Sequence, residues 1–215
     1  MIKLLFGTGN YAKLNVMKDH LKGMEIELIG LKDLAYPWPK VEENGRDPLE
    51  NARVKALAYF DCCHMPVFSC DSGLYIEGLE PSRQPGVHVR NIDGRTLSDE
   101  EMVAHYAAIA QRMGGSCKAR YQNAICLVIN ENEIYEYSQE DISGETFLIV
   151  DVPHNRAEEG FPIDRLSVHI ASGLYYNDME NYDICSSMGA GMRGFFRRSL
   201  KHSCITSDKA MKIMI

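Results

Sequence analysis

The stretch IKLLFGTGNYAKLNVMKDHLK, residues 2–22, decides how the chain begins to fold. Its apolar run at 2–6 stops at a glycine-rich turn, which predicts a short buried strand. After the turn, the apolar residues Leu14, Met17 and Leu21 recur at helical spacing. The opening is therefore predicted to be a strand, a glycine turn and a helix.

Two capping motifs predict the next helices. Asp47 at the N-cap, Pro48 at the first helical position and Glu50 at the third form a capping box, which starts a helix from residue 48 to about 60. Ser98 and Glu101 form a second capping box, and the helix that it starts should end at the glycine pair 114–115.

The remaining apolar runs are predicted to be strands. Residues 66–70 are typical of a buried strand, which residues 71–73 are expected to interrupt before 74–76 continue extended. Further strands of a meander are predicted at 119–129, 134–137 and 145–150, with a turn at 130–133. Because helices alternate with strands first and strands follow strands later, we expect an α/β fold with a mixed sheet.

The last third carries weaker signals. Residues 153–164 are predicted to be a loop, residues 186–201 combine three glycines with three arginines, and Ser207 is a candidate cap of a short closing helix. Since no repeat or linker divides the sequence, residues 1–215 are predicted to form a single domain.

Composition limits the classes of partner. The chain has 215 residues, of which 30 are acidic and 23 basic, giving a net charge of −7. This balance, without a long basic run, argues against a nucleic-acid polymer as partner. No apolar run reaches the roughly 18 residues that span a bilayer, and seven cysteines without a Cys-x-x-Cys spacing indicate reduced thiols. We therefore expect a cytoplasmic protein without a membrane partner.

Three segments could carry chemistry. The turn at 7–13 offers backbone N–H groups and a helix dipole to an anion, and Lys13 adds a full charge; the alternative is a tight turn with a surface lysine. Asp71, at the end of a predicted strand, could bind a cation or accept a proton from water; the alternative is a turn residue that caps Gly73. Glu43 precedes a glycine turn, and its alternative is a solvated loop.

Together and in order, the motifs resemble the inosine triphosphate pyrophosphatase family, the XTP/dITP diphosphatases. The resemblance runs from residue 4 to about 166. It rests on Thr8-Gly9-Asn10-x-x-Lys13, Glu43-x-Gly45, Glu50-Asn51-Ala52-x-x-Lys55-Ala56, Asp71-Ser72-Gly73-Leu74, Pro85-Gly86-Val87 with Arg90, Gly144-Glu145, and Arg156 before Gly160-Phe161-x-x-Asp164.

The resemblance implies a fold and an activity. The fold is an elongated mixed central sheet flanked by helices, in two lobes with a nucleotide cleft between them, and the protein is a homodimer. The activity is Mg²⁺-dependent hydrolysis of a nucleoside triphosphate, on non-standard purine nucleotides such as ITP, dITP and XTP. It releases a nucleoside monophosphate and pyrophosphate.

The resemblance also implies roles for particular residues. Asp71 is the catalytic proton acceptor, and Glu43 and Asp71 bind the metal. The substrate-binding residues are Thr8, Gly9, Asn10, Lys13, Lys55, Ser72, Arg90, Phe161, Asp164 and Arg193. Among them, Thr8, Asn10, Lys13 and Lys55 hold the triphosphate. Phe161 and Asp164 fall in the base pocket.

The sequence departs from the family pattern in three places. Cys70 replaces the first of two acidic residues before Ser-Gly, and Pro162-Ile163 replaces Gly-Tyr in the family's Phe-Gly-Tyr-Asp-Pro. The C-terminal Lys and Ser-His-Arg have no clear match; Ser187 and Gly191-Met192-Arg193 are the best candidates, and the alternative is a mobile surface loop at 189–194. We therefore expect an altered base pocket. A catalytically weak nucleotide-binding protein and a Maf-like diphosphatase for pyrimidine or modified nucleotides remain as alternatives.

Overall fold

The computed structural model describes residues 1–35, 37–157, 159–179, 186–201 and 203. The chain divides into two compact units. The first contains residues 1–71, 123–142 and the C-terminal helix, and the second contains residues 72–122 and 143–184. Ser207 lies outside the described residues. The described helices include none that is both long enough and apolar enough to cross a membrane.

The first unit opens as the sequence predicts, with a strand, a turn and a helix. Its elements are β1 (Ile2–Phe6), α1 (Tyr11–His20), β2 (Ile26–Gly30), η1 (Leu31–Asp33), α2 (Pro48–Cys63), the start of β3 (Val67–Ile76), the end of β6 (Ser116–Asn130), β7 (Glu133–Tyr137), η3 (Glu140–Ile142) and α4 (Ser186–Lys201). β1 pairs in parallel with both β2 and β3, whereas β6 and β7 form an antiparallel hairpin.

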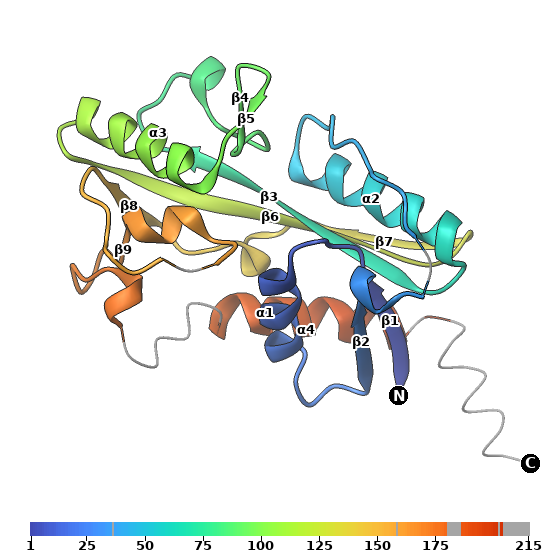
Figure 1. Cartoon of the computed structure of the whole chain (residues 1–215). Coiled ribbons are helices and arrows are strands. Elements are labelled where there is room, and N and C mark those ends of the chain that lie inside the picture. The colour runs from blue at the N-terminus through green and yellow to red at the C-terminus, as the bar shows by residue number, and fades with distance from the viewer. Residues whose placement is uncertain (36, 158, 180–185, 202, 204–215) are drawn as a thin grey trace, which may run out of the picture. The chain divides into compact units, whose positions relative to one another are not determined.

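Alternation along β1 separates the two faces of this unit. Leu4 and Phe6 pack with α1 and α4, whereas Leu5 packs on the other face with Ala52 and Ala56 of α2. Figure 1 shows the same arrangement, with α2 on one side of the strands and α1 and α4 on the other. Strands that are covered on both faces are expected to be apolar on both, as β1 is from Leu4 to Phe6.

The second unit is built around one amphipathic helix. Its elements are the end of β3, η2 (Pro81–Arg83), β4 (Asn91–Ile92), β5 (Arg95–Thr96), α3 (Asp99–Arg112), the start of β6, β8 (Phe147–Val150), η4 (Pro162–Leu166), β9 (Ser167–Val168) and η5 (Tyr176–Asp178). The predicted capping box of Ser98 and Glu101 starts α3, which packs Tyr106 and its apolar neighbours against β8 and η4.

The strand order confirms a mixed α/β sheet. Within the described residues it is β2-β1-β3-β6-β8-β9, with β7 also paired to β6 and the β4–β5 hairpin separate. The predicted meander is wrong in one respect, because β8 pairs with the first half of β6, at Ser116 to Ala119, and not with β7. The strand β6 is long enough to serve both partners.

The predicted interruption of β3 at residues 71–73 is also wrong. β3 runs without a break from Val67 to Ile76, and Asp71 lies within it. Pairing on either side keeps the segment extended, through β1 at Val67 and through an isolated bridge between Leu74 and Gly86. A Cβ at Gly73 would lie 3.3 Å from the carbonyl carbon of Gly86, so this glycine permits a close backbone approach rather than a turn.

The glycine-rich stretch at 189–194 is helical, so a mobile loop is wrong there. It belongs to α4, which buries Met192, Phe195 and Phe196 in the core beneath β1. Gly191 is buried where α4 crosses η3, and a Cβ at this position would collide with the carbonyl oxygen of Asp141. The glycines therefore allow close packing that the sequence alone did not reveal.

Gly191→Ala should lower the free energy of unfolding by roughly 1–3 kcal/mol, because the new methyl group meets backbone that cannot rotate away. Gly194→Ala is the matched control, since a Cβ there meets only the guanidinium end of Arg198, at 3.2 Å. The control should be neutral or gain up to about 1 kcal/mol from helix propensity. Urea unfolding followed by circular dichroism measures both, and equal stabilities would contradict the packing.

Candidate active site

The charged centre of the first unit is a buried lysine between two carboxylates. The Nζ of Lys55 donates to Oε2 of Glu43 at 2.7 Å and to Oδ1 of Asp71 at 3.0 Å. The side chains of Lys55 and Asp71 are each 11% exposed, whereas that of Glu43 is 45% exposed. The structure thus brings together three predicted site residues.

Local structure explains why these groups converge. Asp47 caps α2 by accepting from the backbone N–H groups of Leu49 and Glu50, both at 2.9 Å. The predicted capping box is incomplete, because the Glu50 carboxylate accepts from the N–H of Arg46 and not from that of Asp47. With the start of α2 fixed, Lys55 lies in its third turn and points toward β3.

Asn51 is a site residue to which sequence reasoning assigned no role. Its side chain is 2% exposed; Nδ2 donates to Oδ2 of Asp71 at 2.9 Å, and Oδ1 accepts from the N–H of Gly45 at 2.8 Å. One amide thus orients the Asp71 carboxylate and holds the loop that carries Glu43. The available signal was its position four residues before Lys55, on the same helix face.

The glycine turn before α1 is built by its own polar side chains. Oδ1 of Asn10 accepts from the N–H groups of Ala12 at 2.9 Å and Lys13 at 3.3 Å, and Oγ1 of Thr8 accepts from the N–H of Asn10 at 3.2 Å. A Cβ on Gly9 would meet nothing within 4 Å. The side chains of Thr8 and Asn10 therefore fix the shape of the turn, and the space at Gly9 stays open.

Charge and burial set the two lysines apart. Burial opposes the charge of Lys55, but Asp71 and Glu43 outweigh it and raise the pKa of this lysine. Burial and the nearby charge of Lys55 lower the pKa of Lys13, against the smaller opposing effect of the carboxylates. Burial also raises the pKa of the Cys70 thiol to about 12, so Cys70 brings no negative charge to Lys13.

The donor set fits a magnesium ion that is shared with a substrate. Mg²⁺ prefers oxygen ligands and is commonly held by one or two carboxylates together with phosphates and water. Glu43 and Asp71 direct oxygens at one point, the present position of the Lys55 Nζ. The described residues include no group of three or more His, Cys, Asp or Glu side chains that could hold a metal by themselves.

The other predicted substrate-binding residues have structural contacts. The guanidinium of Arg90 donates to the Leu97 carbonyl at 3.0 Å and to Asp99 at 2.7 Å, which ties it to the start of α3. Phe161 and Asp164 lie at η4, and Ser72 lies in β3.

The C-terminal candidates make packing and hydrogen-bond contacts in the structure. Met192 is 3% exposed and Ile163 is 2% exposed, so both side chains belong to apolar cores. Arg193 donates to the carbonyl oxygen of His20 at 2.8 Å, at the end of α1. The side chain of Ser187 lies outside what the structure describes.

Comparison with known proteins now places the chain. A family model described as the Ham1 family matches residues 4–179. The chain belongs to the Ham1 family. Ham1-family relatives include a dITP/XTP pyrophosphatase of Thermus thermophilus, 30% identical over 180 residues, which are 83% of this chain and 81% of that protein. That of Mannheimia succiniciproducens is 26% identical over 185 residues, 84% of this chain and 88% of that protein.

Solved Ham1 structures share the fold. The HAM1 protein of Coxiella burnetii aligns with a TM-score of 0.67 and 24% identity, over 93% of this chain and 98% of its own. The Ham1 protein of Staphylococcus aureus aligns with a TM-score of 0.67 and 19% identity, over 91% of this chain and 98% of its own. The resemblance drawn from the sequence motifs is therefore confirmed for family and fold.

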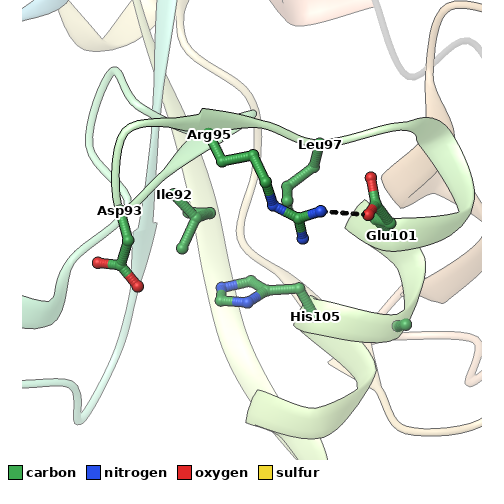
Figure 2. A pocket seen from close by; sticks show the side chains of 7 residues that line it. Ile92, Asp93, Arg95, Leu97, Glu101 and His105 are labelled. Atoms are coloured by element: carbon green, nitrogen blue, oxygen red, sulfur yellow. Dashed lines mark hydrogen bonds and ion pairs between the residues drawn. The ribbon is translucent and has the colours of Figure 1, made fainter.

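A hollow of about 490 Å³ in the second unit contains none of the predicted site residues. Figure 2 shows it between the β4–β5 hairpin and α3, with Arg95 paired to Glu101 at 2.7 Å and His105 beneath. Burial and the charge of Arg112 lower the pKa of His105. In this Ham1-family protein the carboxylates and lysines of the first unit remain the site best suited to phosphate chemistry.

Asn51→Asp should destabilise the protein at pH 7.5, because it places a second carboxylate against Asp71. Protonation of one carboxyl group relieves that repulsion as the pH falls, so the loss should shrink toward pH 5. Asn51→Leu is the control: it leaves the Gly45 N–H and Asp71 without their amide partner and should cost about 1–3 kcal/mol at both pH values. Urea unfolding at the two pH values tests this; an Asn51→Asp loss that did not shrink would contradict the contact.

Proposed function

We propose that this protein hydrolyses nucleoside triphosphates between the α and β phosphates, with Mg²⁺, to a nucleoside monophosphate and pyrophosphate. We further propose that it acts as a homodimer in the cytoplasm on non-standard purine nucleotides. The observation that carries the proposal is the Glu43–Lys55–Asp71 cluster near Lys13. The relatives named dITP/XTP pyrophosphatase support the same reaction.

Local charge must recruit the substrate, since the chain has a net charge of −7. At physiological salt, charges more than about 8 Å apart are largely screened, so contacts at the site decide the interaction. Lys13 forms no ion pair among the described residues, and the open turn at Gly9 lies just before it in the chain. Lys13, Lys55 and the turn from Thr8 to Asn10 would bind the triphosphate.

Asp71 would accept the proton of the attacking water. Asn51 donates to its Oδ2 at 2.9 Å and so orients the carboxylate. When Mg²⁺ is bound by Glu43 and Asp71, it supplies charge neutralisation of the phosphates. The oxygen of water attacks the phosphorus, the pyrophosphate leaves, and the proton of the water goes to Asp71.

Further residues would bind the substrate and recognise its base. Ser72 and Arg90 would complete the substrate contacts, Phe161 and Asp164 would face the base, and Arg193 would read it. Because Arg193 also binds the His20 carbonyl, its alanine variant must be judged for stability as well as for substrate preference.

Asp71→Asn should lower kcat by about 10²–10⁴-fold, because the amide has nearly the same shape but can neither take the proton nor offer a full charge. Asp61→Asn on α2 is the matched control, since it makes the same substitution on an exposed side chain. Pyrophosphate release measures both. Near-native kcat in Asp71→Asn with unchanged circular dichroism would refute the role.

A panel of nucleoside triphosphates, scored for pyrophosphate rather than phosphate, tests the function itself. Activity should disappear in EDTA and return with Mg²⁺. The preference for ITP or XTP over ATP and GTP, as a ratio of kcat/KM, should be well below the roughly 10⁴–10⁵ that well-built donor-lined sites reach, or another nucleotide should be the best substrate. A strong preference that Arg193→Ala leaves unchanged would show that other residues read the base. Release of pyrophosphate from none of the nucleotides would refute the enzyme.

A further inference from the structure

We propose that Lys55 is an internal cation that holds the metal position between Glu43 and Asp71 closed until a triphosphate draws it away. This inference rests on the proposed function and adds a rule for how the metal and the triphosphate bind. The metal then binds the protein tightly only together with the phosphates. Lys55, which would otherwise count as one more phosphate ligand, couples the two binding events.

The competition follows from the shared oxygens. The Lys55 Nζ is within hydrogen-bond distance of Oε2 of Glu43 and Oδ1 of Asp71, the oxygens that would ligate a cation. An ammonium and a divalent ion cannot occupy the same point. Because Lys55 and Asp71 are buried, replacing their ion pair by contacts with water would cost free energy. Lys55 therefore stays on the carboxylates until another anion is available.

The net charge of the cluster also favours binding of the metal together with a triphosphate. Glu43 and Asp71 are already balanced by Lys55 and Lys13, so a divalent ion alone would leave the cluster with two excess positive charges. A triphosphate supplies the missing negative charge. It also offers Lys55 oxygens that replace those of the carboxylates, so the lysine stays paired after it moves.

The site can make this exchange without moving its backbone. Lys55 lies on α2 and reaches the carboxylates through a flexible four-carbon stem. Asn51 donates to the other Asp71 oxygen, Oδ2, and holds Gly45 through its own Oδ1. The Asp71 carboxylate and the loop that carries Glu43 therefore keep these Asn51 contacts when the ammonium leaves.

Mn²⁺ titration of the protein without nucleotide tests the exchange, with free Mn²⁺ measured by electron paramagnetic resonance. Lys55→Met removes the competing cation at similar length and should bind Mn²⁺ about 10- to 100-fold more tightly than the wild type. Lys55→Arg retains a cation and should bind as weakly as the wild type. Equal affinity in the wild type and Lys55→Met would overturn the proposal.

Lys13→Met separates contact from general electrostatics. It removes the same charge nearby, but Lys13 forms no ion pair with either carboxylate within the described part of the chain. Its gain in Mn²⁺ affinity should stay below about fivefold, as expected for a screened through-space effect. A gain as large as that of Lys55→Met would mean that no exchange is needed.

A second measurement uses the wild type and does not depend on how Lys55→Met folds. The ¹H–¹⁵N signal of the Lys55 ammonium, assigned by its loss in Lys55→Arg, should shift when Mg²⁺ and tripolyphosphate are added together. It should stay in place with Mg²⁺ alone. A signal that is unchanged under both conditions would show that Lys55 remains on the carboxylates.

These outcomes are separable from the enzymatic proposal. Equal Mn²⁺ affinities together with pyrophosphate release from a nucleotide would overturn the exchange and leave the enzyme standing. Tight Mn²⁺ binding by Lys55→Met, together with a wild type that releases pyrophosphate from no nucleotide, would support the exchange and refute the enzyme.

Discussion

The site depends on one ammonium group buried between two carboxylates. A buried charge is costly unless it is paired, and removing one partner of such a pair typically destabilises a protein by about 3–5 kcal/mol. The Lys55 contacts therefore constrain α2, β3 and the loop at Glu43 together. Apolar packing brings these segments within reach, because Ala52 and Ala56, both fully buried, let α2 lie close to the strands.

The glycine turn joins the same arrangement through close packing. A Cβ on Gly7 would collide with the ring of Tyr59 on α2 and with the hydroxyl of Ser69 on β3, and Ser69 donates to the Gly7 carbonyl at 3.2 Å. Tyr59 follows Lys55 by four residues, so one face of α2 holds both the carboxylates and the turn. The anion-binding segment and the charged cluster are thus positioned by one helix.

Local signals predicted the parts of this site that depend on neighbouring residues. The strand, turn and helix at the N-terminus and the starts of α2 and α3 were right, because caps and periodicity act over a few residues. The turn at Asp71–Gly73, the place of β8 in the meander and the alternative of a loop at 189–194 were wrong. Pairing with distant strands and packing against η3 override local preference there. The bridging role of Asn51 also needs Gly45 and Asp71, which the sequence does not place beside it.

Cys70, which departs from the family pattern, gives Lys13 and Lys55 different surroundings. A carboxylate at that position would give Lys13 a close negative neighbour, whereas the thiol, with its pKa raised to about 12, stays neutral. Both carboxylates of the cluster form ion pairs with Lys55, and Lys13 has no ion partner among the described residues. An unpaired, partly buried ammonium gains more from an arriving phosphate than a paired one, since no existing contact must be broken first. Lys13 is thereby suited to make the first phosphate contact and Lys55 the later one, and the chain's net negative charge does not prevent either.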